Sequence, residues 1–450
     1  MKDASSEFNK NSFFSHLPDL KATWLYRLLA FAFFFELGLQ SVSKGWGYQV
    51  AYFTILALLI FDALKANALS LKVLFFGSSL IFLLASLWSL PYITNHAYLS
   101  GLFALFAFGA LLSRNKAQYE EKILWGLRLS TILLYFFAFL HKLNVDYVSP
   151  PQSCVMWVWN EQIVPRFFPS VFQINGRAVS TVFIWGSLLL EAVLAVCLAT
   201  RLPKKWLFIL AYIFHGALSF RFPLISLIML PLFLSFVPRT AEKGDLISPW
   251  FWNPFVLGAL VFFTHRMPPG GSLHEVFILG AWLAPLLYSY FGWQIFRHFQ
   301  EESTSPLEPN LLARGPLPRV FLLLIVLSGF APYLGLKTFQ SFSMYSNLRV
   351  EGGVTNHFFL PQLSLSSRLD ELVLVRKTNH PRLLRYENRT KFMPEEFMKN
   401  LLDEKSRYFA EYERVSSQQS QRYEGKPRLL STMQKKFFGT RVLDPSGCTW

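Results

Sequence analysis

Residues 134–148, LYFFAFLHKLNVDYV, end a long apolar run with a histidine and a lysine side by side. The run covers 123–141, and a helix needs roughly 20 mostly apolar residues to cross a bilayer. His141 and Lys142 therefore stand at the end of an expected membrane-spanning helix. Ionisable side chains at that depth are costly and are candidates for function.

The composition of the whole chain is typical of a membrane protein. Of its 450 residues, 52% are hydrophobic and 16% are charged, against about 25% charged in soluble globular proteins. Apolar runs predict about eleven crossings, at 23–43, 48–65, 71–92, 96–113, 123–141, 179–199, 205–221, 223–237, 251–265, 273–296 and 318–336. Because 205–221 and 223–237 are short and adjacent, a re-entrant hairpin or a bent pair there would lower the count to nine or ten. The sequence predicts an all-α, polytopic transmembrane bundle of about 9–11 helices.

Composition divides the chain into four parts. Residues 1–22 are polar and lack the apolar stretch of a secretory signal, so the first apolar run is expected to remain as an anchor. A transmembrane domain covers 23–300, and a linker with the last transmembrane helix covers 301–336. A small soluble domain is expected over 337–450, where the stretch EEFMKNLLDEKSRYFAEYERV looks helical.

The net charge of +15 indicates how the bundle is oriented. Lys and Arg concentrate in every second connection, as they do on the cytoplasmic side of membrane proteins. The N-terminus is therefore expected in the cytoplasm, and an odd number of crossings makes the C-terminal domain extracytoplasmic. The lipid bilayer explains the basic charge, so a nucleic-acid partner is not expected.

This orientation gathers four ionisable side chains in the outer half of the bilayer: His96, His141, Lys142 and His215. Poor solvation of a charged lysine favours the neutral amine, which can act as a base. Histidines nearby can pass or stabilise protons. Glu191, in the middle of the run 179–199, is the carboxylate placed to partner one of them.

Each of these side chains also has a structural interpretation. Lys142 can snorkel from a helix end to the interface, and His141 can be an interfacial residue. His96 can begin a helix, and Glu191 can be a buried hydrogen-bonding group. His215 can donate to a backbone carbonyl within the bundle. Their common placement on one side favours a site.

Three segments carry a family resemblance. FFAFLHKLNVDYV is similar to the segment that holds the catalytic lysine of vitamin K-dependent γ-glutamyl carboxylase, and TNHAYLSGLFALFAFGAL is similar to its Asn-His-x-Tyr-Leu-x-Gly-Leu segment. EAVLAVCLATRLPKKWLFILAYIFHGALSF resembles the following helices with their Phe-His pair. The wider group is the HTTM (horizontally transferred transmembrane domain) family, found in that carboxylase and in many bacterial membrane proteins. The resemblance covers roughly residues 20–300 and implies a multi-pass protein of a bacterial inner membrane.

The resemblance implies a lyase that carboxylates glutamate in an extracytoplasmic protein or peptide, or a related acceptor. Its lipid-soluble cofactor would be reduced vitamin K, a naphthoquinol, or a similar quinol, with oxygen and carbon dioxide as co-substrates. By position, Lys142 would be the base that deprotonates the quinol, His96 would assist it, and His215 would match the Phe-His pair. The residues expected to bind the cofactor are His141, Glu191 and Tyr98.

The sequence departs from the family at several points. His141 stands where a second lysine can occur, and Tyr147 stands where tryptophan is common. The large lumenal β-rich domain of the animal enzyme is replaced by a short tail. Residues 336–361 resemble an element of some bacterial HTTM proteins, and they follow the last helix on the expected face of Lys142. The candidates there for lining the mouth or binding a ligand are Asn347, Arg349, Glu351, Asn356 and His357. The alternative is an ordered polar loop that closes the bundle.

Two other functions stay open from the sequence. One is a non-catalytic transporter or binding scaffold, with the outer polar cluster as its solute site, and the other is a structural partner that docks a protein through its tail. Cys154, Cys197 and Cys448 show no paired spacing, so neither a metal site nor a disulfide framework is expected. The chain has no nucleotide-binding motif and no G-x-S-x-G elbow, which argues against ATP-driven transport and serine hydrolysis.

Overall fold

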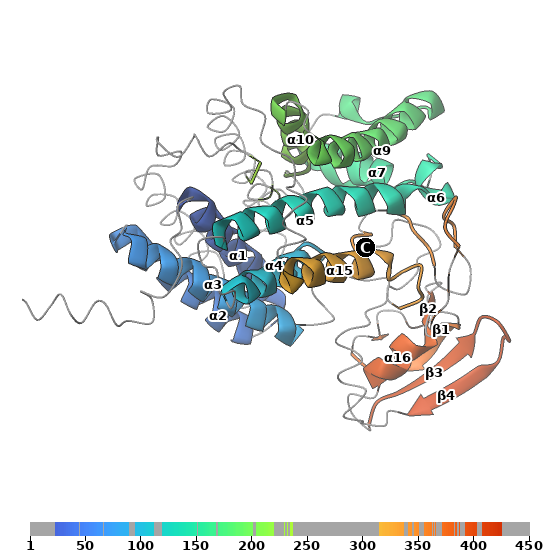
Figure 1. Ribbon diagram of the computed structural model, residues 1–450. Helices are drawn as coiled ribbons and strands as arrows, with labels where there is room; N and C mark the ends of the chain where they lie inside the picture. Colours follow the sequence, from blue (N-terminus) through green and yellow to red (C-terminus); the bar gives the residue numbers. More distant parts are fainter. Residues whose placement is uncertain are drawn as a thin grey trace, which may run out of the picture. The chain divides into compact units, whose positions relative to one another are not determined.

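The computed structural model describes residues 23–44, 46–65, 67–89, 95–111, 119–150, 152–167, 170–200, 204–219, 229, 232, 235–236, 315–336, 341–343, 346–350 and, with gaps, 355–424. Most of the described chain is helical (Figure 1). The long helices are α1 (Thr23–Lys44), α2 (Trp46–Lys65), α3 (Ala68–Ser89), α4 (Asn95–Leu111), α5 (Tyr119–Lys142), α9 (Arg177–Ala199), α10 (Lys204–Ser219) and α15 (Pro316–Phe330).

Four of these helices contain stretches long and apolar enough to cross a membrane: Gly47–Lys65, Ala68–Trp88, Tyr119–Lys142 and Arg177–Ala199. They expose large apolar side chains, such as Leu84 on α3 and Leu189 on α9, as a helix that contacts lipid does. Shorter apolar helices cover Leu25–Phe34, Ala97–Leu111 and Pro316–Phe330. The predicted runs 251–265 and 273–296, and nearly all of 223–237, lie outside the described residues.

The chain forms two compact units, each built from three separate stretches. The first contains Met1–Trp88, Leu99–Ile132 and Val196–Leu322. Its helices pack through aromatic rings, as in the stacked Phe33–Phe82 pair at 4.6 Å. A buried ion pair fastens α1 to α2, because Arg27 Nε donates to Asp62 Oδ2 at 2.6 Å. The hydroxyl of Ser70, on α3, donates to the other oxygen of Asp62 at 2.7 Å.

The second unit contains Ser89–Tyr98, Leu133–Ala195 and Leu323–Trp450. Within it, the end of α5 lies between α9 and α15 (Figure 1). Gly329 on α15 allows close packing, since a Cβ there would overlap the ring of Phe137 on α5. Small residues permit such close approach between helices in membranes.

Short helical segments connect α5 to α9. They are α6 (Val145–Val148), α7 (Cys154–Trp157), the π-helical segment η3 (Val158–Ile163), α8 (Val164–Phe167) and the 3-10 turn η4 (Ser170–Phe172). Asn144 caps α6, because its side-chain oxygen accepts from the backbone N–H of Tyr147 at 2.9 Å. Asn is a favoured N-cap residue for this reason.

The C-terminal part contains a four-stranded antiparallel sheet in the order β2-β1-β3-β4, with β1 at Leu372–Thr378, β2 at Phe392–Pro394, β3 at Phe409–Arg414 and β4 at Ser420–Glu424. Helix α16 (Glu395–Leu402) packs on this sheet (Figure 1). The core between them contains Val373, Val375, Leu383, Met393, Met398, Leu402, Ala410 and Tyr412.

This sheet corrects two expectations. The all-α prediction describes the apolar helices but misses the strands, and the helix expected over EEFMKNLLDEKSRYFAEYERV ends at Leu402. The segment FAEYER is strand β3, which buries Ala410 and Tyr412 at alternate positions. A period of two buries one face of a strand, and here that tertiary burial overrides a charged composition that favours a helix.

The expectation that the cysteines form no disulfide framework is also wrong, because Cys154 at the start of α7 is disulfide-bonded. Cys197 on α9 is a free thiol, and Cys448 lies outside the described residues. Sequence spacing missed this bond because the fold, not distance along the chain, decides which cysteines meet.

Candidate functional site

Helices α5 and α9 bring one basic and one acidic side chain together inside the second unit. Nζ of Lys142, the last residue of α5, donates to Oε1 of Glu191 on α9. Both residues are buried, with exposed fractions of 8% and 5%. Glu191 lies in the middle third of α9, so the pair is far from both ends of that helix. A snorkelling lysine would keep its amine in water, and burial of Lys142 against Glu191 argues against that alternative.

The carboxylate of Glu191 uses only one of its two oxygens in this ion pair. Oε2 of Glu191 is buried and has no hydrogen-bond partner among the residues that the structure describes. A buried acceptor left unpaired costs free energy, so such a group calls for an explanation. One explanation is that a ligand hydroxyl or a mobile proton uses this oxygen.

An aromatic residue covers the amine from the other side. Nζ of Lys142 lies 5.8 Å from the ring centroid of Tyr147 on α6, within the range of a cation–π contact. The hydroxyl of Tyr147 shares a 2.9 Å hydrogen bond with the hydroxyl of Ser187. Ser187 is one helical turn before Glu191 on α9, so both side chains lie on the same face of that helix.

His141 and His357 have structural partners. Nε2 of His141 contacts the carbonyl of Gly329 at 2.9 Å. Nδ1 of His357 accepts from the backbone N–H groups of Phe359 and Leu360, so the proton is on Nε2, which donates to the carbonyl of Leu140 at 2.9 Å. Burial lowers the pKa of His357, and the bond to Leu140 offsets part of that shift. His357 is therefore a neutral residue that fastens its segment to the end of α5.

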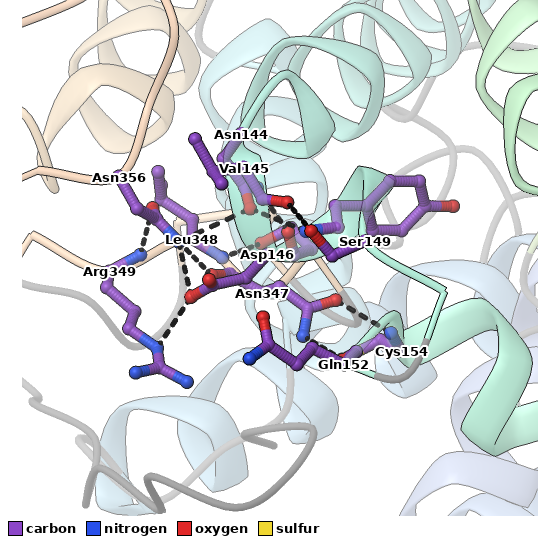
Figure 2. A network of polar contacts seen from close by, with 12 residues as sticks. Asn144, Val145, Asp146, Ser149, Gln152, Cys154, Asn347, Leu348, Arg349 and Asn356 are labelled. Atoms are coloured by element: carbon purple, nitrogen blue, oxygen red, sulfur yellow. Dashed lines mark hydrogen bonds and ion pairs between the residues drawn. The ribbon is translucent and has the colours of Figure 1, made fainter.

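A polar network joins the segment after α15 to the end of α5 (Figure 2). Asn356 donates to Asp146 Oδ2 at 2.9 Å and to the Asn347 carbonyl at 2.8 Å. Arg349 forms an ion pair with Asp146 at 3.0 Å, and Asn347 accepts from the backbone N–H of Cys154 at 2.7 Å. These groups satisfy one another, which favours the alternative of an ordered polar loop that closes the bundle.

The other predicted site residues fall in three places. Tyr98 is in the second unit, where its hydroxyl shares a 3.0 Å hydrogen bond with Ser328. His215 is buried on α10 in the first unit, with its ring 5.2 Å from that of Phe214. Glu351 and the side chain of His96 lie outside the described residues. The structure therefore brings Lys142, Glu191 and His141 into one unit and does not test the predicted roles.

Sequence reasoning missed Ser187, Asn144 and Asp146. The spacing of Ser187 and Glu191 in the sequence is a visible signal, because residues four apart share a helix face. Asn144 also carries a signal, since Asn before a short run is typical of an N-cap. Asp146 gives no comparable signal, because its partner Arg349 is distant in the sequence.

Comparison with protein-family models, with curated proteins and with solved structures gives no match for this chain. Within the described part of the chain, no three His, Cys, Asp or Glu side chains are grouped to hold a metal ion. The site is therefore interpreted from its own geometry, which is a buried amine and a buried carboxylate in direct contact.

An amine and a carboxylate in direct contact can exchange a proton. A charged amine with a carboxylate and a neutral amine with a carboxylic acid hold the same number of protons. Poor solvation of charge lowers the free-energy difference between these charged and neutral forms. In the second form the Lys142 amine is a base. Arginine would not give this choice, because its guanidinium stays protonated in proteins.

Proposed function

We propose that this protein is an integral, multi-pass membrane enzyme in which Lys142 acts as a base and Glu191 takes up the proton that frees its amine. The observation that carries the proposal is the buried contact between Lys142 and Glu191, with one carboxylate oxygen left without a partner. Buried titratable side chains in direct contact are candidates for functional sites. A purely structural ion pair would be expected to use both carboxylate oxygens, as Asp62 does with Arg27 and Ser70.

The substrate class that suits this site is a lipid-soluble molecule with an acidic hydroxyl, such as a quinol. A reduced naphthoquinone would supply a phenolic proton for the amine to accept. Lys142 and the unpaired oxygen of Glu191 are the groups that would hold that hydroxyl, and the ring of Tyr147 would shield the amine from water. Apolar surroundings are also what such a ring requires.

The acceptor that we propose is glutamate or a related carbon acid. Carbon dioxide carboxylates it while oxygen oxidises the quinol to the quinone epoxide. This part follows from the resemblance of the segments around Lys142 to vitamin K-dependent γ-glutamyl carboxylase.

We also propose that the N-terminus is cytoplasmic and the C-terminal sheet extracytoplasmic. Lys and Arg in alternate connections support this orientation. The disulfide-bonded Cys154 supports it as well, because disulfides persist in oxidising compartments and Cys154 follows α5 on the expected outer side.

A binding scaffold is the second candidate, and the polar network after α15 favours it. Its donors and acceptors are paired with one another, as in a rigid structural element. In that case the Lys142–Glu191 contact would hold two helices together, and no chemical turnover would depend on it.

The test is an assay on the protein in lipid nanodiscs with reduced naphthoquinone, oxygen, labelled bicarbonate and a glutamate peptide. We expect quinone epoxide and labelled carbon uptake, both lost in Lys142→Met and retained in the matched control Lys72→Met, which changes a buried lysine on α3. Formation of the epoxide without carbon uptake would support Lys142 as the base and would reject glutamate as the acceptor. Full activity in a folded Lys142→Met protein would contradict the proposal.

A further inference from the structure

A cleft opens between the segment after α6 and the beginning of α9. Its volume is about 790 Å³, within the usual size of small-molecule sites. The walls come from the loop at Ser149–Gln152, from α7 and η3, and from the first turn of α9. All of these belong to the second unit, and the side chains that line the cleft are different from those around Lys142 and Glu191.

The cleft has a fixed frame. Asn160, in η3, makes two hydrogen bonds with the backbone of Ile174, each 2.9 Å long. Trp159 Nε1 donates to the carbonyl of Phe172 at 2.9 Å. These bonds fix the chain just before α9, and Gly176 turns it into the helix with a φ of 87° that suits glycine. π-Helical segments such as η3 are frequent at functional sites.

Two opposite charges stand in the walls without satisfying each other. Glu161 on η3 and Arg177 on α9 both line the cleft and are both exposed. Among the described residues, neither side chain forms an ion pair or a hydrogen bond. The first N–H groups of α9 add to the positive character around Arg177, as helix N-termini do.

The remaining walls suit the body of a small ligand. Trp157 offers an aromatic face, which attracts an ammonium group, and Met156 and Ile174 offer apolar contact. Asn175 and Gln152 provide amide groups for hydrogen bonds. We infer that the cleft binds a small zwitterion, with its acidic group at Arg177 and its amine at Glu161 and Trp157. Two sources share this chemistry: a free amino acid or short peptide, and a phosphoethanolamine lipid headgroup.

The cleft adjoins the buried pair without sharing its charged groups. Met156 lines the cleft and packs with Tyr147, Ile184 and Leu188, and Tyr147 covers the amine of Lys142. A zwitterion in the cleft would therefore be separated from Lys142 by one layer of side chains. Binding does not require the amine, so this inference stands apart from the proposed function.

The experiment is titration calorimetry on the full chain in phosphatidylglycerol nanodiscs, whose lipid lacks an amine. The probes are triglycine and O-phosphoethanolamine, with N-acetyl-triglycine amide as the uncharged control. We expect at least one zwitterion to bind, with Arg177→Gln and Glu161→Gln each weakening it about tenfold, the value of one lost charge-assisted hydrogen bond. Binding of triglycine alone would indicate a peptide or amino acid, and binding of O-phosphoethanolamine alone would indicate a lipid headgroup.

Three further variants make the result decisive. The exchange of charges in the double variant Glu161→Arg with Arg177→Glu should restore part of the affinity, because the ligand can reverse in the cleft. Arg319→Gln, an exposed arginine on α15 outside the cleft, should leave binding unchanged, as should Lys142→Met. No binding of either zwitterion, or binding that neither Arg177→Gln nor Glu161→Gln weakens, would overturn the inference.

Discussion

The two units each contain a buried ion pair between helices, and the pairs differ in how completely they are satisfied. In the first unit, Oδ2 of Asp62 accepts from Arg27, and Oδ1 accepts from Ser70 and, at 3.5 Å, from Arg27 as well. In the second, Glu191 accepts from Lys142 with Oε1, whereas Oε2 has no partner among the described residues. The first pair is a saturated clasp between helices, and the second retains an open acceptor.

The two ion pairs also differ in their basic residue, which is Arg27 in the first unit and Lys142 in the second. A guanidinium keeps its proton in proteins, whereas a buried amine can lose it. The proposed proton exchange is therefore confined to the pair of Lys142 and Glu191. The comparison indicates that stability should depend most on the first pair and chemistry most on the second.

The largest expected effect on stability comes from breaking the saturated pair. Asp62→Asn should lower the free energy of unfolding by about 3–5 kcal/mol, because it leaves the largely buried Arg27 guanidinium without an opposite charge. Denaturant unfolding in micelles, followed by circular dichroism, measures the loss. The control is Glu413→Gln, which breaks the exposed pair with Arg376 and should cost less than about 1 kcal/mol. A similar cost for both variants would refute the assignment of Asp62 as a structural clasp.

Glu191→Gln should have a smaller effect on stability and a large effect on turnover. We expect a loss of about 1–3 kcal/mol, since the glutamine amide oxygen can still accept a hydrogen bond from Nζ of Lys142. Turnover should fall by about 10²–10⁴, the usual contribution of a positioned proton acceptor. Parallel unfolding and quinol-turnover assays separate the two quantities. A variant that is as unstable as Asp62→Asn but fully active would reverse the roles assigned to the pairs.

A third carboxylate, Glu395, lies beside the C-terminal sheet, outside the apolar helices, and can be compared with Asp62 and Glu191. Burial raises the pKa of Glu395, but hydrogen bonds from Arg414, Lys399 and Tyr412 outweigh it and bring the pKa to about 2. The unfolded value is about 4.3, so this carboxylate stabilises the sheet above pH 4.3, and the contribution is lost as the pH falls toward 2.

After solvent screening we expect this contribution to be about 1–2 kcal/mol. Denaturant-dependent proteolysis of the full chain between pH 7 and pH 2, with an acid-stable protease at the low end, follows protection of the strands. Glu395→Gln should flatten the dependence on pH. If protection of the strands in Glu395→Gln still depends on pH as in the unchanged protein, the pH dependence comes from other groups.

The smallest expected effect comes from the hydroxyl beside the open pair. Ser187→Ala removes the partner of the Tyr147 hydroxyl and should cost about 1 kcal/mol of stability. Because the Tyr147 ring still covers Lys142, turnover should change less than in Glu191→Gln. Loss of turnover as large as that of Glu191→Gln would place Ser187 in the proton path instead.

The apolar helices could be predicted from the sequence because hydropathy decides them locally. The run 123–141 predicts α5, and 179–199 predicts α9, to within a few residues. The sheet could not be predicted in this way, since FAEYER becomes a strand only by pairing with β1 and packing under α16. The disulfide at Cys154 likewise depends on contacts that sequence spacing does not reveal.

The candidate site was predictable in its residue types and less so in its contacts. Ionisable side chains inside or beside apolar runs are unusual, which is why Lys142 was predicted as a base and Glu191 as a partner for one of the four basic side chains. The direct contact between Lys142 and Glu191 depends on how α9 is rotated about its axis relative to α5. That rotation is set by tertiary packing and cannot be read from the sequence of either helix alone. The loop with Asn347 and Asn356 contains candidate ligand groups, yet the fold pairs them with each other.

The most direct test of the account is infrared difference spectroscopy of the protein in nanodiscs before and after reduced naphthoquinone is added. Proton exchange predicts a change in the carboxylic-acid C=O band that disappears in Glu191→Gln and in Lys142→Met and persists in Ser70→Ala, which removes a hydrogen bond to Asp62 in the first unit. A spectrum without that change, or a change that survives in Glu191→Gln, would contradict the claim that Lys142 and Glu191 exchange a proton.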